Sequence, residues 1–200
     1  MAIYGPYSPT VSAVEGSVGT IDWVDGDNAF SSNDAYATTE VPALQNGEVS
    51  KYLLLTGFGA AVQSAESSSL ITVRVERSIA DGMSSPPLDS VADHSIVLFS
   101  GGAVIATGTP SPDYWSTSDE IVTYTFTDLL SAATLNDSTF GVGISAASFS
   151  NGGSVTALID HVTVTINAAF GDASVIGAAE AALNRSQPWH KFEKHRVVSY

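Results

Sequence analysis

Two Asp-His pairs come nearest to catalytic chemistry in residue type and spacing, Asp93-His94 and Asp160-His161. A carboxylate beside an imidazole can orient it as a general base. The chain has no G-x-S-x-G turn to supply a nucleophile for that base, and neighbours on a strand point to opposite faces. We therefore expect structural roles, with the Asp160 carboxylate accepting backbone N–H groups and His161 exposed. We expect no catalytic residues, and a protein that is not an enzyme.

An acid-rich segment near the N-terminus is a candidate metal site. Asp22, Asp25, Asp27 and Asp34 offer carboxylate oxygens, and Ca²⁺ takes several oxygen ligands. The stretch DGDN matches only part of a calcium loop, and Asp and Asn in turns explain the same residues without a metal. We expect no cofactor, with a structural calcium ion as the alternative.

Tyr114 and Trp115 are the candidate glycan-binding residues. They lie together in a Ser- and Pro-containing segment, TPSPDYWSTS, at residues 109–118. An exposed aromatic ring combines an apolar face with a polar edge, which suits a sugar ring. The alternative is that the two rings plug the end of the hydrophobic core.

The C-terminal tail, residues 185–200, is the strongest candidate for binding a protein partner. Its cations and aromatic rings alternate: Arg185, Trp189, Lys191, Phe192, Lys194, Arg196 and Tyr200. With one acid, Glu193, the tail carries +3, and subtracting it from the net charge of −14 leaves −17 on residues 1–184. Aromatic and Arg residues are frequent interface anchors. We expect the tail to dock on an acidic protein surface, such as that of a second copy, and the alternative is a disordered tail.

Composition excludes several classes of protein and site. The net charge of −14 disfavours nucleic acid as a partner, because such binding needs a basic face. The chain has no cysteine, which excludes disulfides and thiolate metal sites. It has no 18-residue apolar run to span a membrane and no signal peptide at its start. We expect no membrane association.

Strands with alternating apolar residues must position these candidates. Ser69–Arg77 places Ile71, Val73 and Val75 on one face. In Ser154–Ile166 the alternating apolar residues stand at odd positions before Asp160-His161 and at even positions after it. This change of phase predicts a β-bulge at Asp160-His161. A Gly101-Gly102 turn predicts a hairpin between residues 95–99 and 103–106.

About eight or nine such strands predict a mainly β fold, an antiparallel β-sandwich of jelly-roll type with a short C-terminal helix and an extended tail. We expect an N-terminal arm at 1–18, with one edge strand at 11–14, and a sandwich domain at 19–168. The C-terminal helix, at about 173–183, and the basic aromatic tail occupy 169–200.

Several short blocks within Thr20–Ile166 carry a resemblance to a known family. The blocks are Trp23, Asn28-Ala29, Asp34-Ala35-Tyr36-Ala37, Leu53–Phe58, the strand of Ile71, Val73 and Val75, Ser138–Val142 and ALIDHVTVTI. In these blocks the chain resembles β-sandwich domains of bacteriophage structural proteins. The resemblance implies a jelly-roll virion protein in a capsid decoration, fibre or baseplate role, and it transfers no catalytic residues.

We interpret the chain as a capsid decoration (cement) protein, made in the host cytoplasm and located in the virion. As a homo-oligomer it would stabilise the shell by contacts with the major capsid protein or another virion protein. The alternative is a tail-fibre, baseplate or receptor-binding module that recognises host surface glycan. Removal of residues 185–200 would detach a decoration protein, whereas mutation of Tyr114 and Trp115 would abolish attachment by a glycan-binding module.

Overall fold

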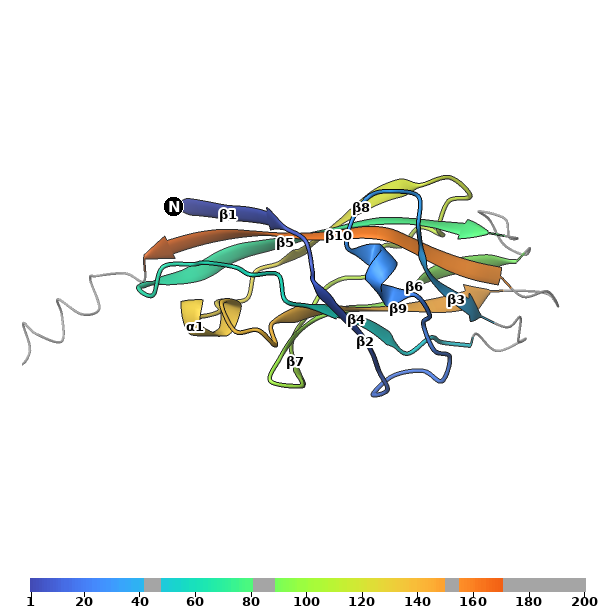
Figure 1. Cartoon of the computed structure of the whole chain (residues 1–200), viewed down its shortest axis with the longest axis horizontal. Coiled ribbons are helices and arrows are strands. Elements are labelled where there is room, and N and C mark those ends of the chain that lie inside the picture. Colours follow the sequence, from blue (N-terminus) through green and yellow to red (C-terminus); the bar gives the residue numbers. More distant parts are fainter. Residues whose placement is uncertain (42–47, 81–88, 150–154, 171–200) are drawn as a thin grey trace, which may run out of the picture. The chain divides into compact units, whose positions relative to one another are not determined.

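Two antiparallel β-sheets pack face to face in the computed structural model of this chain (Figure 1). The structure describes residues 1–41, 48–80, 89–149 and 155–170. The first sheet has the order β1-β10-β5-β8, and β3 also pairs with β10. The second sheet has the order β2-β4-β9-β6-β7. The expected antiparallel β-sandwich is confirmed.

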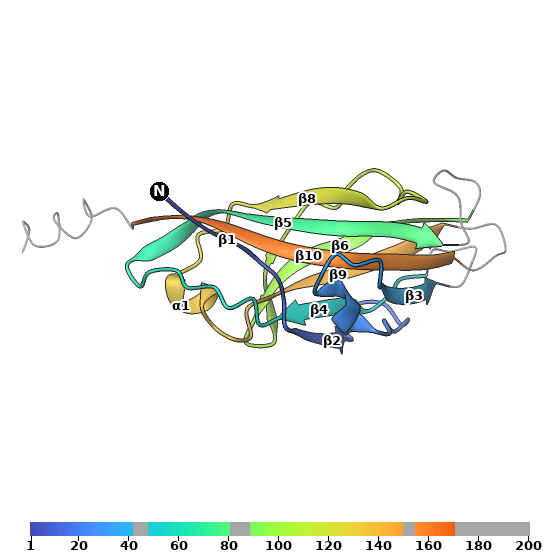
Figure 2. The same cartoon turned by 45° about the horizontal axis from the view of Figure 1, so that its top comes forward.

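The strands of the first sheet are β1 (Ala2–Tyr7), β3 (Ala37–Val41), β5 (Glu66–Ala80), β8 (Glu120–Phe126) and β10 (Val155–Phe170). Those of the second are β2 (Val11–Glu15), β4 (Tyr52–Thr56), β6 (Ser90–Ser100), β7 (Ala103–Thr107) and β9 (Gly141–Phe149). Consecutive strands mostly belong to different sheets, which is typical of a jelly roll, and β6 and β7 form the predicted hairpin. Figure 2 shows the two layers from a second direction.

The core lies between the sheets and follows the alternation of the strands. Ile71, Val73 and Val75 of β5 are fully buried, as the sequence predicts. On β9 every residue from Gly141 to Ser148 is buried, because this strand is central in its sheet and covered on both faces. A Cβ at Gly143 would lie 2.6 Å from Cε2 of Phe99, so only glycine fits beneath that ring.

The predicted change of phase on β10 is present. Val155, Ala157 and Ile159 are buried in the first half, and the buried positions after His161 are the even ones. Ile159 and Asp160 are buried in succession, so the side chains change faces there. β3 pairs with β10 before this point and β1 pairs with it after, and the phase change thus coincides with an exchange of neighbours.

The N-terminal segment is not an arm outside the sandwich, which corrects the predicted boundary at residue 18. β1 pairs with β10 in one sheet, and β2 pairs with β4 in the other. β2 contains the edge strand predicted at 11–14. Gly5-Pro6 interrupts the sequence of β1. Besides its pairing with β10, the strand is attached by Tyr4 and Tyr7, which pack against the core.

Two short helical segments complete the described residues: η1 (Gly26–Ala29), a 3-10 turn, and α1 (Ala132–Leu135). α1 begins after Ser131, whose Oγ accepts the backbone N–H of Thr134 at 3.2 Å, a normal N-cap. No helix among the described residues is long and apolar enough to cross a membrane. The helix predicted at 173–183 and the tail lie outside the described residues.

Candidate functional site

A charged cluster is buried between the two sheets. Arg77 of β5 is 0% exposed and forms an ion pair with Asp93 of β6 through Nη1 and Oδ1. Nε of Arg77 donates to Oε1 of Glu120 at 3.2 Å, and the guanidinium carbon lies 4.9 Å from the centroid of the Trp115 ring. Since Arg77 and Asp93 belong to different sheets, their ion pair links the two layers across the core.

The Asp93 carboxylate organises the residues around it. Oδ1 accepts from Nε1 of Trp115 at 2.8 Å. Oδ2 accepts from the hydroxyl of Tyr124 at 2.7 Å and from the backbone N–H of Ser111 at 2.8 Å. A buried charge is tolerated only when it is paired and hydrogen-bonded, and Asp93 meets both conditions. The carboxylate thereby fixes the segment that begins near Ser111 and ends at Trp115.

Tyr124 is held as a neutral hydroxyl within this cluster. Its Oη accepts from Nη1 of Arg77 at 2.8 Å while it donates to Asp93. Burial raises the pKa of Tyr124 well above its ordinary value, and the negative charge of Asp93 raises it further. The ring therefore has a fixed position and a fixed protonation state at neutral pH.

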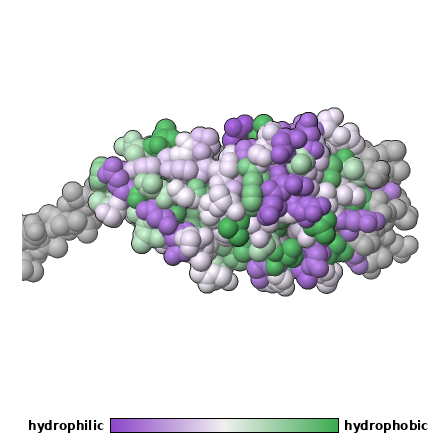
Figure 3. Space-filling model, in the orientation of Figure 1, coloured by the Kyte–Doolittle hydropathy of each residue, from purple (hydrophilic) through white to green (hydrophobic). Residues whose placement is uncertain are grey.

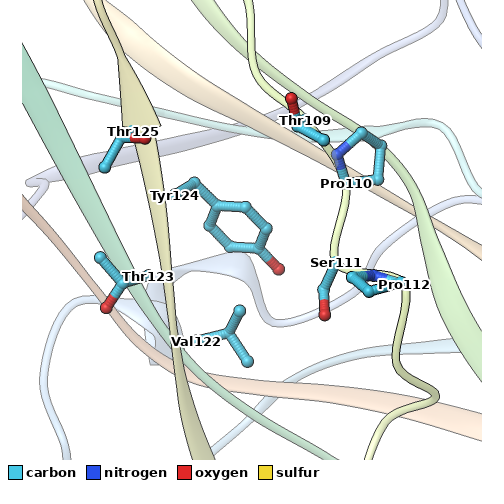
Figure 4. A pocket seen from close by; sticks show the side chains of 8 residues that line it. All are labelled: Thr109, Pro110, Ser111, Pro112, Val122, Thr123, Tyr124 and Thr125. Carbon is cyan, nitrogen blue, oxygen red and sulfur yellow. The ribbon is translucent and has the colours of Figure 1, made fainter.

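A groove of about 310 Å³ lies directly beside this cluster, and we call it the edge groove. Its lining residues are Thr109, Pro110, Ser111, Pro112, Val122, Thr123, Tyr124 and Thr125. β8 is the last strand of its sheet, and the segment 109–112 runs beside it as the opposite wall (Figure 4). The side chains of Val122 and Tyr124 point toward this segment, whereas Thr123 and Thr125 point to the other side of the strand (Figure 4).

The edge groove offers hydroxyl groups and apolar surface without charge. No acidic or basic side chain is among its eight lining residues. Thr109 and Ser111 supply hydroxyls, each of which donates and accepts, while Pro110, Pro112 and Val122 supply apolar surface. Its volume is at the lower end of the range for small-molecule sites, roughly 300–1,000 Å³. These properties suit an uncharged ligand that carries hydroxyl groups.

Tyr114 and Trp115 do not form the predicted sugar-stacking pair. Trp115 is 0% exposed and its ring covers Arg77, so the alternative of a core plug is correct for this residue. Tyr114 is half-buried and packs edge-on against Phe149, with ring centroids 5.5 Å apart. The segment 109–118 does border a groove, but its Thr, Ser and Pro residues do so rather than its two aromatic residues.

The two Asp-His pairs match the structural expectation in part. The register of β6 with β9 shifts between Asp93 and Ser95, which leaves His94 exposed while Asp93 is turned into the core. Oδ1 of Asp160 accepts the backbone N–H of Asn33 at 3.2 Å, as predicted. His161 is not fully exposed as expected. It is half-buried, with Nε2 2.9 Å from Oγ of Ser8.

The four aspartates considered for calcium are engaged separately. Asp22 forms an ion pair with Lys51 at 2.7 Å, and Asp27 accepts from Oγ of Ser12 at 2.6 Å. Asp25 and Asp34 have positive φ angles of 53° and 62°, as short Asp side chains in turns permit. Within the described ranges, no group of three or more His, Cys, Asp or Glu side chains is placed to hold a metal ion. Figure 3 shows a band of hydrophilic side chains on the face of the molecule that Figure 1 turns toward the viewer.

The seven tail residues predicted to bind a protein partner, from Arg185 to Tyr200, lie outside the described residues. Their docking role stays a prediction.

The groove depends on Arg77, Asp93 and Tyr124. The sequence did not single out Arg77 or Tyr124, and it marked Asp93 only as part of an Asp-His pair. One signal was present for Arg77, because it continues the odd-numbered phase of Ile71, Val73 and Val75 into the core. Asp93 carried no such signal, since its burial depends on the register shift at His94 and on Arg77 reaching it from the other sheet.

Comparison with known proteins finds distant structural neighbours. No family model and no curated protein sequence matches the chain. A CBM4 domain is similar at a TM-score of 0.40 and 16% identity, covering 78% of this chain and 94% of that one. The N-terminal cellulose-binding domain of Cellulomonas fimi β-1,4-glucanase C is similar at 0.36 and 14%, covering 83% and 92%.

The enzymatically active domain of tailspike protein 4 from bacteriophage CBA120 is also similar, at a TM-score of 0.38 and 15% identity. The match covers 82% of this chain but 22% of the tailspike chain. At these values the likeness transfers no function to this protein.

Proposed function

We propose that this protein is a glycan-binding β-sandwich domain that holds an uncharged sugar in the edge groove. The observation that carries the proposal is the absence of charge in the groove of a protein whose net charge is −14. An uncharged site in so acidic a protein favours a ligand for which hydrogen bonding and shape decide affinity.

The lining matches the surface of a sugar ring. A sugar has hydroxyl groups around its rim and C–H groups on its faces. Thr109 and Ser111 can donate to and accept from the hydroxyls, and the rings of Pro110 and Pro112 can pack against the C–H face. Backbone groups at the open edge of β8 add further donors and acceptors.

The groove is preorganised by the buried cluster. The bond from the Ser111 N–H to Asp93 fixes one wall, and the bonds of Tyr124 to Asp93 and Arg77 fix the other. Binding to a preformed site avoids the entropic cost of ordering its walls. A buried ion pair seldom adds net stability compared with apolar packing. The buried Arg77–Asp93 pair therefore supports a role in positioning the walls of the groove.

The proposed function is binding without catalysis. Glycoside hydrolysis uses two carboxylates that flank the scissile bond, and the groove lining contains none. The Asp93 carboxylate behind it is already occupied by Arg77, Trp115, Tyr124 and Ser111.

This proposal corresponds to the receptor-binding alternative from the sequence, relocated from the Tyr114-Trp115 pair to the edge groove. The capsid decoration function rests on residues 185–200, so the described residues add no support for it. The virion location and the homo-oligomer stay predictions.

A glycan array of neutral and acidic bacterial surface oligosaccharides and neutral glucans tests the proposal. The double variant Thr109→Val/Ser111→Ala removes two groove hydroxyls and keeps the Ser111 N–H that bonds Asp93. Each lost hydrogen bond costs about 0.5–1.5 kcal/mol, so affinity for a neutral glycan should fall about tenfold.

The matched control is Thr117→Val/Ser118→Ala, which makes the same changes at exposed positions outside the groove. Its affinity should equal that of the wild type. Binding of no glycan, or equal affinity of both double variants, would contradict the proposed function.

A further inference from the structure

A second pocket, of about 190 Å³, opens on the outer face of the first sheet, and we call it the outer-face pocket. It crosses the whole sheet, because its lining comes from β1, β10, β5 and β8. The lining residues are Pro6, Arg74, Glu76, Ile121, His161 and Thr163. Except for Pro6, they occupy the strand positions that alternate with the core residues, so they face away from the interior.

Arg74 distinguishes this pocket electrostatically. The described residues contain three Lys or Arg side chains. Lys51 pairs with Asp22, and Arg77 pairs with Asp93 and Glu120, whereas Arg74 has no ion pair within the described part of the chain. An exposed cation that makes no ion pair leaves its guanidinium donors available to a ligand.

Glu76 places a complementary acceptor beside those donors. It lies two positions from Arg74 on the same face of β5, and no hydrogen bond to it is found among the described residues. The guanidinium donates and the carboxylate accepts, so the two can bind adjacent hydroxyl groups of one ligand. Their opposite charges cancel, which favours a neutral polyol over an anion.

The remaining lining residues of the outer-face pocket supply apolar surface and further polar groups. Ile121, which is 54% exposed, supplies apolar surface at the β8 end of the pocket, and Pro6 supplies it at the β1 end. The His161 ring is held by Oγ of Ser8 at 2.9 Å, and Thr163 adds a hydroxyl. The pocket thus combines apolar surface with a polar edge, as the edge groove does.

The two pockets adjoin each other across β8. Arg74 pairs with Thr123 and Glu76 with Ile121 in the register of β5 and β8. Thr123 borders the edge groove and Ile121 borders the outer-face pocket. Two residues along a strand span about 7 Å, so a single short chain can reach from one pocket to the other.

We propose that the outer-face pocket is a second subsite for the glycan of the edge groove, and that the ligand is therefore a neutral oligosaccharide that crosses β8. Arg74 and Glu76 hold adjacent hydroxyls of the sugar unit next to the one in the groove. This inference rests on the proposed function, and it assigns the ligand a length and a charge.

Titration calorimetry with two probes tests the subsite: the neutral oligosaccharide that gives the highest array signal, and the monosaccharide of the unit that the groove binds. The variants are Arg74→Gln and Glu76→Gln, and the control Lys51→Gln removes the same charge elsewhere. Hydrogen bonds to charged groups contribute about 1.5–3 kcal/mol each, so Arg74→Gln should weaken oligosaccharide binding at least tenfold.

Monosaccharide binding should be unchanged in all three variants, and Lys51→Gln should bind both probes as the wild type does. Oligosaccharide affinity should also be the same in low and high salt, because a neutral ligand has no charge to screen. Unchanged oligosaccharide binding by Arg74→Gln, with groove binding intact, would overturn the subsite alone. Weaker oligosaccharide binding in high salt would contradict the inference that the ligand is neutral. Binding of no glycan at all would overturn both the subsite and the proposed function.

Discussion

At the scale of single residues, Asp93 matters most to the candidate site. It is the one carboxylate that receives Arg77, Trp115, Tyr124 and the Ser111 backbone together. The sequence marks Asp93 only as the neighbour of His94, and nothing in that pair predicts that the carboxylate is buried. Its role arises from a contact between two sheets, and such contacts depend on topology rather than on neighbouring residues.

Asp93→Asn should destabilise the protein strongly. The amide keeps the shape of the carboxylate but removes its charge, so the buried Arg77 keeps only the part-exposed Glu120 as a counter-ion. Breaking a buried ion pair costs about 3–5 kcal/mol. Chemical denaturation measures the change in unfolding free energy. The control Asp113→Asn alters an exposed carboxylate in the same segment and should stay within about 0.5 kcal/mol of the wild type. Equal stability of the two variants would show that the cluster does not hold the sheets.

The Tyr36 hydroxyl should lose its proton only at strongly alkaline pH. Its hydroxyl donates to Oδ2 of Asp119 at 2.9 Å, and this bond, together with burial, raises its pKa from 10.0 to about 12. A raised tyrosine pKa adds stability that is complete below pH 10 and is lost as pH rises toward 12.

Tyrosinate absorbance during an alkaline titration checks this expectation. Tyr36→Phe should remove one late-titrating group from the profile and reduce the loss of stability between pH 10 and 12. A titration profile above pH 10 that Tyr36→Phe leaves unchanged would contradict the bond to Asp119.

At the scale of elements, periodicity predicted the strands well wherever one face is buried. The alternation of Ile71, Val73 and Val75 and the phase change on β10 are both confirmed, because a period of two records which face meets the core. The sequence did not predict β1 as a strand of the sandwich, because β1 lacks a regular apolar alternation. Gly5-Pro6 interrupts its pattern, and its attachment depends on Tyr4 and Tyr7.

The role of β1 leads to a test by truncation. A chain that lacks residues 2–8 should lose about 2 kcal/mol or more of stability. The deletion removes the contacts of Tyr4 and Tyr7 with the core, and Glu66 loses the hydrogen bond that Tyr4 donates to it. Thermal and chemical denaturation measure the loss. If this segment were a free arm, the truncated and full chains would unfold at the same denaturant concentration.

The edge groove also illustrates a limit of sequence reasoning at this scale. The segment 109–118 was a candidate because of its two aromatic residues, yet its Thr, Ser and Pro residues line the groove. Trp115 follows the wall and turns inward because its indole N–H bonds Asp93. A sequence shows that a segment contains a Trp, whereas the partner of its N–H decides whether the ring reaches a ligand.

At the scale of the whole molecule, an acidic body presents two adjoining pockets that carry no net charge. The edge groove lies at one margin of the first sheet, and the outer-face pocket lies on that sheet. Composition alone predicted the acidity and disfavoured nucleic acid, because net charge is a sum over the chain. The neutrality of the two pockets is a property of position, which only the fold reveals.

The central prediction is that a glycan binds in the edge groove. Nuclear magnetic resonance of the isotope-labelled protein, titrated with the array-selected neutral oligosaccharide, tests this directly. We predict that backbone amide signals of Thr109, Ser111 and residues 122–125 shift progressively and saturate, with weaker shifts around Arg74 and Glu76. No saturable shift with any array-positive glycan, or shifts confined to residues away from both pockets, would contradict the account.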